Sequence, residues 1–196
     1  MEDKLLLPTS YISFTQWQMW LKSPERYKRE YFEGEDKLDT KYLRFGKGAA
    51  EARERRELKE GEITELELKV EINGVPVLGY IDCYNSKEHY FEEEKTGKVP
   101  WTESKVQKWE QLPFYATLLK WKYGTMPDHC VLHWFETKDQ DEDQGGLQND
   151  IEFTGYEKEF RRDFDEREIL RIEESIVKVV HEISESYKKY LENLDL

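Results

Sequence analysis

The Asn73-Gly74 pair constrains the fold of this chain most, because it separates two stretches in which apolar residues alternate with polar ones. Asn-Gly between alternating stretches is a strong signal for a tight β-hairpin. Residues 64–72 and 75–84 are therefore expected to pair as antiparallel strands. A second polar turn at residues 85–88 leads to another strand pattern at residues 89–95. The simplest prediction is a meander of three antiparallel strands.

Helical periodicity surrounds this meander. Apolar residues recur at helical spacing in four segments: 8–32, 41–60, 103–122 and a long charged stretch at 156–192. Ser13 is expected to cap the first helix, and Ser23-Pro24 resembles a second helix start with proline at the first helical position. Residues 129–136 are expected to form a buried strand, and residues 138–150 an exposed acidic loop. With no internal repeat and no linker, the pattern predicts a single α/β (α+β) domain over residues 1–196.

Composition narrows the class of protein. The net charge of −13 excludes a uniformly basic nucleic-acid coat, but it allows an enzyme with a local basic groove. The 27 aromatic residues supply a core and argue against disorder. No apolar run is long enough to cross a bilayer, and the N-terminus lacks a secretory pattern. Two cysteines, Cys83 and Cys130, make no disulfide framework. We therefore expect a soluble, cytoplasmic protein with no membrane partner.

The second hairpin brings three charged residues together. If its turn is centred between Lys87 and Glu88, Asp82 lies opposite Glu93. Two facing carboxylates repel each other, and a divalent cation bound by both would offset the repulsion. Lys95 is two residues beyond Glu93, so it is expected on the same face. The alternative is an ordinary polar strand edge, and a register slip of one residue would separate the acids.

Four segments of the chain resemble the motifs of the PD-(D/E)XK nuclease superfamily, in its RecB-like branch. In chain order, they are SFTQWQMWLKSP (13–24), GYID ending at Asp82, FEEEKTG (91–97) and QLPFY (111–115). The resemblance implies a restriction-endonuclease-like core, with a mixed central β-sheet flanked by helices. It also implies that Asp82 and Glu93 bind Mg²⁺ or Mn²⁺, that the backbone carbonyl of Glu94 completes the ligands, and that Lys95 assists the attacking water.

The QLPFY segment implies two further catalytic residues. Gln111 and Tyr115 are four residues apart, so they share one face of a helix. In nucleases of this type, the equivalent residues line the site and contact the DNA backbone or its end. A role for Tyr115 in the core is the alternative, whereas a buried glutamine needs hydrogen-bond partners.

The sequence departs from the RecB-like pattern at two places. The G-x-x-x-H motif that usually supplies a metal-binding histidine starts at Gly46, but its last position is Ala50. The neighbouring Glu51, or Glu54 one turn later, could take over as metal ligand or could be an ordinary solvated glutamate. Ser23 stands where some relatives have a cluster-binding cysteine, and with two cysteines in the chain we expect no iron–sulfur cluster.

These observations together predict a metal-dependent deoxyribonuclease that hydrolyses phosphodiester bonds without a covalent intermediate. A small exonuclease or end-processing enzyme of recombination, repair or phage DNA metabolism would fit, with single- or double-stranded DNA as its partner. The main alternative is a catalytically inactive adaptor or nucleic-acid-binding protein that keeps the nuclease fold. A nuclease acting on RNA is a third possibility.

Overall fold

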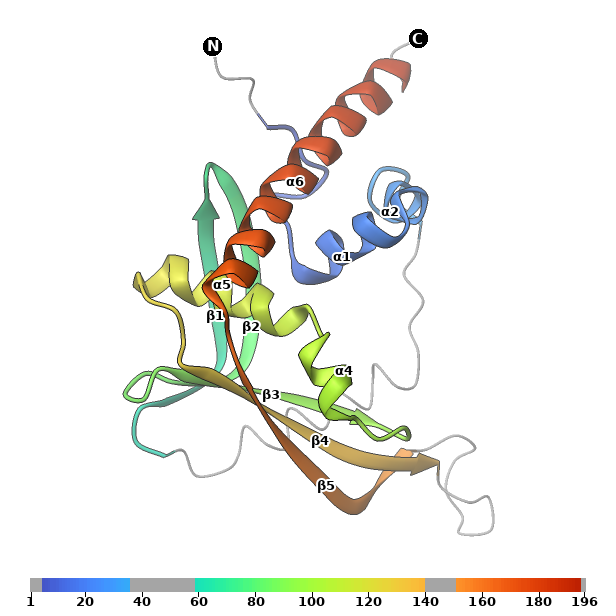
Figure 1. The fold of residues 1–196 in the computed structure, drawn as a ribbon. Helices are drawn as coiled ribbons and strands as arrows, with labels where there is room; N and C mark the ends of the chain where they lie inside the picture. The colour runs from blue at the N-terminus through green and yellow to red at the C-terminus, as the bar shows by residue number, and fades with distance from the viewer. Residues whose placement is uncertain (1–4, 36–58, 140–150, 195–196) are drawn as a thin grey trace.

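The computed structural model describes residues 5–35, 59–139 and 151–194 (Figure 1). Their elements follow the order α1 (Phe14–Lys22), α2 (Pro24–Tyr31), β1 (Glu62–Ile72), β2 (Val75–Asn85), β3 (Tyr90–Gly97), α4 (Glu103–Gln107), α5 (Gln111–Tyr123), β4 (His129–Asp139), β5 (Ile151–Asp163) and α6 (Glu166–Leu194). The helix predicted at 41–60 and most of the loop predicted at 138–150 lie outside these residues.

The strands form one five-stranded sheet in the order β1-β2-β3-β4-β5. The pairs β1–β2, β2–β3 and β4–β5 are antiparallel, whereas β3 and β4 are parallel, so the sheet is mixed as predicted. In Figure 1, the β1–β2 hairpin rises away from the part of the sheet formed by β3, β4 and β5. The predicted Asn73-Gly74 turn is confirmed, with both residues at positive φ.

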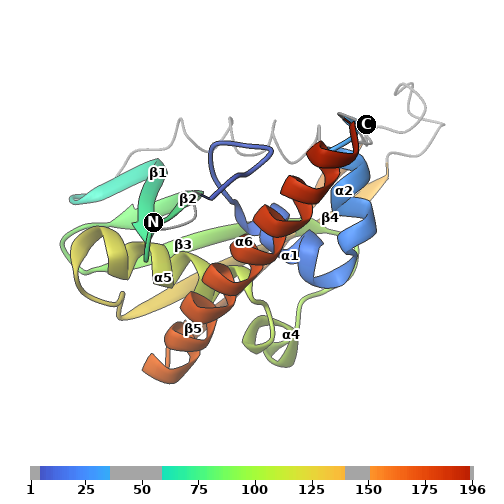
Figure 2. The same ribbon diagram turned by 90° about the horizontal axis from the view of Figure 1, so that it is seen from above.

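Helix α5 packs against the hairpin, α6 packs against α5, and α1 lies beside α6 in both ribbon views (Figures 1 and 2). Helix α5 is buried on nearly all sides from Leu112 to Leu119, as expected for a helix between a sheet and a second helix. The indole N–H groups of Trp17 and Trp20 in α1 donate to Ser175 (3.2 Å) and Glu182 (2.9 Å) of α6. These contacts fix the N-terminal helix on the same layer as α5.

Two of the predicted helical segments each contain two helices. The segment 8–32 divides at Ser23, and the second helix start predicted at Ser23-Pro24 is confirmed, because Pro24 is the first residue of α2. The cap predicted at Ser13 is confirmed as a capping box with Gln16. The helix expected over 103–122 is also divided, into α4 and α5, with a break at residues 108–110.

The largest error concerns residues 156–163, which belong to strand β5 and not to the long C-terminal helix. Strand β5 is an edge strand, and between residues 153 and 163 only Phe160 and Arg162 are buried. A charged edge strand carries almost no alternating apolar signal, so it resembles the polar face of a helix. The apolar stripe predicted for α6, from Ile169 to Ile183, is confirmed as buried. No helix in the described ranges is both long and apolar enough to cross a membrane.

Candidate active site

Strands β2 and β3 are paired over a short distance, in the predicted register. The ladder pairs are Cys83 with Glu92, Tyr84 with Phe91, and Asn85 with Tyr90. Asp82 and Glu93 occupy the next positions, but they are not a ladder pair. The expected direct opposition of the two acids is therefore wrong in detail, because the strands separate immediately beyond Cys83 and Glu92.

The Asp82 carboxylate lies at the point of separation. Its Oδ2 accepts a hydrogen bond from the backbone N–H of Glu94, at 2.7 Å. A side chain of β2 thus replaces a backbone partner for β3, which ties the two strands together where their ladder ends. The bond places the Asp82 carboxylate against the backbone of the segment that carries Glu93 and Lys95.

Glu93 is an acid in an unusual environment. Its side chain is almost fully buried, with 2% of the residue exposed. One carboxylate oxygen, Oε1, contacts the Lys95 ammonium group, and Oε2 is buried without a hydrogen-bond partner among the described residues. Burial raises the pKa of Glu93 to about 8, and the nearby Asp82 adds to this rise while Lys95 opposes it.

Lys95 lies on the same face as Glu93, as its position two residues later predicts. Burial alone would lower the pKa of this lysine, but the charges of Glu93 and Asp82 raise it by more, so the net direction is upward. The ammonium group therefore stays protonated at neutral pH. It can donate hydrogen bonds and carry positive charge, but it cannot accept a proton.

Gln111 and Tyr115 are brought together on the first turns of α5. The Gln111 side-chain N–H donates to the Tyr115 hydroxyl oxygen at 2.8 Å, and the Trp109 indole N–H donates to the Gln111 carbonyl oxygen at 3.1 Å. The half-buried amide of Gln111 thus has a partner for its carbonyl oxygen and a partner for its N–H group. Because the Tyr115 oxygen accepts from Gln111, its own hydrogen remains to be donated.

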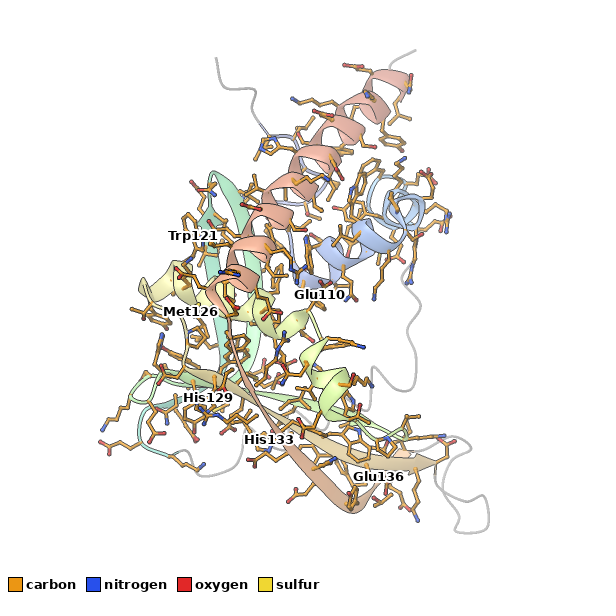
Figure 3. The ribbon with its side chains drawn as sticks, in the orientation of Figure 1. Glu110, Trp121, Met126, His129, His133 and Glu136 are labelled. Atoms are coloured by element: carbon orange, nitrogen blue, oxygen red, sulfur yellow. The ribbon has the colours of Figure 1, made fainter. Side chains whose placement is uncertain are left out.

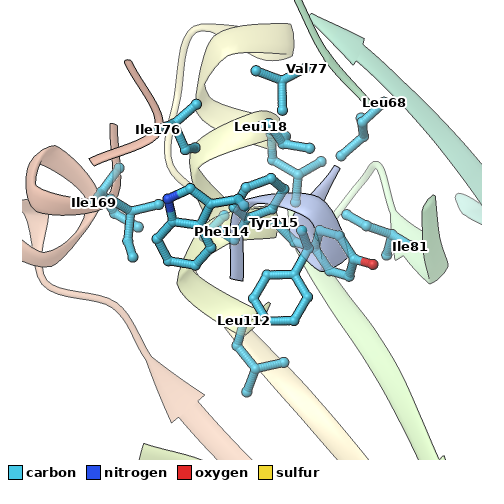
Figure 4. Packing of buried hydrophobic residues seen from close by; sticks show 14 of the residues in the cluster. Leu68, Val77, Ile81, Leu112, Phe114, Tyr115, Leu118, Ile169 and Ile176 are labelled. Carbon is cyan, nitrogen blue, oxygen red and sulfur yellow. The ribbon is translucent and has the colours of Figure 1, made fainter. Parts of the chain in front are cut away.

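Tyr115 is both a core residue and a member of the site. Its ring contacts the rings of Phe91 in β3 and Phe114 in α5. Figure 4 shows Tyr115 among the buried residues that include Phe114 and Leu118. Burial raises its pKa far above the ordinary tyrosine value, and the negative charge of Glu93 raises it further. The hydroxyl therefore remains protonated over the whole physiological range.

Gly79 of β2 allows this close packing, and the sequence analysis did not single it out. A Cβ atom at residue 79 would lie 2.7 Å from a side-chain carbon of Leu118 and 3.1 Å from Cε1 of Tyr115. Such a contact is shorter than carbon atoms tolerate. The glycine three residues before Asp82 thus lets α5 approach the hairpin and carry Tyr115 to the acids.

The donor set fits a hard divalent cation. Carboxylate oxygens are the ligands that Mg²⁺ and Mn²⁺ prefer, and the buried Oε2 of Glu93 is a donor with spare capacity. The side chain of Glu94 points away from that of Glu93, because neighbouring residues on a strand face opposite sides. A contribution of the Glu94 backbone carbonyl, which the resemblance implies, stays a prediction. The predicted ligand Glu51 lies outside the described residues.

A second group of ligand-type side chains lies on the other face of the sheet. Glu62, Cys83 and Glu92 each offer one atom within 4.8 Å of the others. His133 of β4, labelled in Figure 3, has its Nε2 3.6 Å from a Glu92 oxygen. Cys83 and Glu92 directly neighbour Asp82 and Glu93 along their strands, so the two groups face opposite sides of the sheet. This group is separate from the predicted site.

Solved structures resemble this chain in fold. No protein-family model matches the sequence, and no curated protein matches it significantly. A candidate exonuclease from Eubacterium rectale superposes with a TM-score of 0.56 at 12% identity, covering 88% of this chain and 82% of that one. A phage-related exonuclease from Haemophilus somnus gives a TM-score of 0.56 at 14% identity, covering 87% and 81%.

These similarities concern the fold. They establish that the five-stranded mixed sheet and its flanking helices have the architecture of exonuclease structures, as the motif resemblance implied. At 12–14% identity, the roles of single residues do not follow from the superposition. Those roles have to be argued from the chemistry of this site.

Proposed function

We propose that this protein is a metal-dependent nuclease that hydrolyses DNA phosphodiester bonds. The observation that carries the proposal is the buried Oε2 of Glu93, which has no hydrogen-bond partner among the described residues. The charges of Asp82 and Lys95 lie near this carboxylate. A buried carboxylate of this kind is costly unless something positive occupies the open side. The exonuclease-like fold supports the same conclusion.

In this proposal, Asp82 and Glu93 hold Mg²⁺ or Mn²⁺, together with the backbone carbonyl of Glu94. A bound divalent cation would lower the pKa of water and neutralise charge that develops on the phosphate. The water oxygen would form a bond to phosphorus while one P–O ester bond breaks; the water would release one proton to solvent, and the leaving oxygen would take up one proton from solvent. The products are one phosphate monoester and one free hydroxyl group.

The remaining site residues would orient the attacking water and stabilise the negative charge that develops on the phosphate. Lys95 remains protonated, so its role is to hold the attacking water by a hydrogen bond and to offset negative charge on the phosphate. Tyr115 can donate its hydroxyl hydrogen to a phosphate oxygen, and Gln111 fixes the direction of that hydroxyl. A hydrogen-bond donor held in place before the substrate arrives stabilises charge more effectively than water does.

The second candidate function is that of an inactive nuclease-fold protein that binds nucleic acid or a partner protein. It is favoured by Ala50 at the position where RecB-like nucleases have a histidine, and by the net charge of −13. An adaptor of this kind would not need the cation. Metal binding therefore separates the two candidates directly.

The test measures cleavage of single- and double-stranded DNA, and of RNA, with Mg²⁺, with Mn²⁺ and with EDTA. We expect metal-dependent cleavage of DNA, reduced at least about a hundredfold in Asp82→Asn, Glu93→Gln and Lys95→Ala. Glu71→Gln and Lys69→Ala change the same residue types on the exposed side of β1 and should leave activity unchanged. Full activity of Lys95→Ala would contradict the role given to that lysine.

Calorimetric titration with Mn²⁺ tests the site without relying on activity. We expect binding by the wild type and loss of binding in Asp82→Asn and Glu93→Gln. Absence of both cleavage and Mn²⁺ binding in the wild type would favour the adaptor. Preferential cleavage of RNA would support the same active site but show that the substrate is RNA and not DNA.

A further inference from the structure

A cavity of about 310 Å³ adjoins the candidate active site. It lies between the start of α1, strand β2 and the start of α5, and it shares Gln111 and Tyr115 with the site. Four further aromatic residues contribute to its lining: Tyr11, Phe14, Tyr31 and Tyr80. The volume lies at the lower end of the range of small-molecule sites.

The cavity exists because the edge of β2 changes its partner. Where β3 has separated from β2, the chain around Ile12 takes its place: the Ile12 N–H donates to the Pro76 carbonyl and the Leu78 N–H donates to the Ile12 carbonyl, both at 2.9 Å. The chain then turns into α1 through the capping box at Ser13. The two backbone hydrogen bonds of Ile12 thus hold the segment that carries Tyr11 against β2.

The lining favours a flat, uncharged group. Among the described residues that line the cavity, none carries a charged side chain. A phosphate site would be expected to present arginine or lysine. The N-terminus of α1 is a weak substitute, because Gln16 N–H already donates to the Ser13 hydroxyl. Tyrosine rings with nearby hydroxyl and amide groups suit a nucleobase, which needs stacking and a few hydrogen bonds.

Tyr80 is the best-placed stacking residue. It is 48% exposed, and its hydroxyl donates to Glu67 of β1 at 2.8 Å, which limits rotation of the ring. It precedes Asp82 by two residues on β2, so the two Cα atoms are about 7 Å apart. A base stacked on this ring would therefore belong to a nucleotide close to the phosphate at the acids.

We propose that this cavity binds one unpaired nucleobase next to the scissile phosphate, so that the preferred substrate is single-stranded DNA or a single-stranded end. This inference rests on the proposed nuclease function and specifies its substrate class. A cavity of this size admits a single base, whereas a paired base would first have to leave its duplex. The enzyme would thus act on unpaired DNA more readily than on a continuous duplex.

The test measures binding by fluorescence anisotropy in EDTA, where cleavage cannot occur. The probe is a labelled oligodeoxythymidine of about twelve nucleotides, together with a series in which one nucleotide at a time is abasic. We expect one abasic position to weaken wild-type binding by about 5- to 150-fold, the range for loss of one stacked base. A blunt duplex containing the same strand should bind more weakly than the single strand.

Three variants locate the effect. Tyr80→Ala should bind the intact strand as weakly as the wild type binds that abasic strand, and it should no longer distinguish the two. Tyr80→Phe retains the ring and should bind like the wild type. Tyr156→Ala removes an equally exposed tyrosine from β5 and serves as the control.

Several outcomes would overturn the base site: equal binding of intact and abasic strands, unchanged binding by Tyr80→Ala, or equal binding of single strand and duplex. Binding that depends on a 5′-phosphate and not on bases would identify a phosphate site instead. Base-dependent binding by a protein that never cleaves DNA would refute the nuclease function and leave the base site standing. Cleavage with base-independent binding would refute the base site alone.

Discussion

Replacing Glu93 by glutamine should make the metal-free protein more stable at alkaline pH. The wild-type side chain is 2% exposed, and one of its carboxylate oxygens has no partner among the described residues. Its ionised form is therefore poorly solvated in the folded protein. Glutamine has nearly the same shape but never carries the negative charge, so the variant avoids the cost of ionisation.

The direction and size of the effect follow from the pKa of Glu93, which burial raises from 4.5 to about 8. Between these values the folded state holds a proton that the unfolded state has lost, so folding becomes less favourable as pH rises. The stabilisation is complete below about pH 4.5 and is lost as pH passes about 8. At about 1.4 kcal/mol per pH unit, the total is at most about 5 kcal/mol. Between about pH 5.5 and pH 8.5, we expect a difference of about 3 kcal/mol.

The assay is urea unfolding of both proteins in EDTA at these two pH values, followed by tryptophan fluorescence. The free energy of unfolding of the wild type should fall relative to that of Glu93→Gln as pH rises. Groups far from residue 93 titrate equally in both proteins, so the difference between them reports Glu93 together with Lys95, whose pKa the charge of Glu93 raises. Adding Mg²⁺ at about pH 8.5 should then stabilise the wild type and not the variant, since binding to the folded state adds free energy.

The reasoning would be refuted by a difference in stability that does not change with pH. The reasoning would also be refuted if Glu93→Gln were less stable than the wild type at alkaline pH. The ionised carboxylate would then have sufficient hydrogen bonds and charge partners without a cation. Glu71→Gln on the exposed side of β1 provides the baseline for a solvated glutamate.

Three further predictions concern the packing that supports the site. Tyr115→Phe should cost less than about 1.5 kcal/mol of stability but lower the cleavage rate about tenfold or more, measured as kcat with Mn²⁺. Gly79→Ala should lower the free energy of unfolding by about 1–3 kcal/mol, because the new Cβ lies 2.7 Å from a side-chain carbon of α5. Arg162→Ala should cost about 3 kcal/mol in urea unfolding, because this buried arginine pairs with Glu168 at 2.6 Å. The exposed Arg161→Ala is its control, with an expected change below about 0.5 kcal/mol.

The predicted site depended on local geometry, which is why much of it could be foreseen. A short turn fixes hairpin register, so the pairing of Cys83 with Glu92 followed from a turn centred between Lys87 and Glu88. Strand alternation then placed Lys95 beside Glu93. Metal binding and catalytic roles go beyond this geometry and stay predictions.

Long-range features could not be foreseen from periodicity. Strand β5 lies at the sheet edge with most of its side chains in solvent, so its sequence resembles a charged helix. The cavity beside the site depends on residues from α1 and β2, more than sixty positions apart in the chain. Only the fold brings Tyr11 and Tyr80 to one wall, because the bridge between Ile12 and Val77 joins those two segments.

The separation of β2 from β3 explains why the acids and the cavity occur together. A continuous ladder would pair the backbone beyond Cys83 and leave no edge of β2 for Ile12 to occupy. It would also replace the hydrogen bond between Asp82 and the Glu94 N–H with a backbone partner. The same short ladder therefore creates an edge that the N-terminal chain can line and a gap in which two carboxylates lie near Lys95. A cation bound by these acids and a base bound in the cavity would then lie on either side of Tyr115, whose hydroxyl hydrogen can be donated to a phosphate oxygen between them.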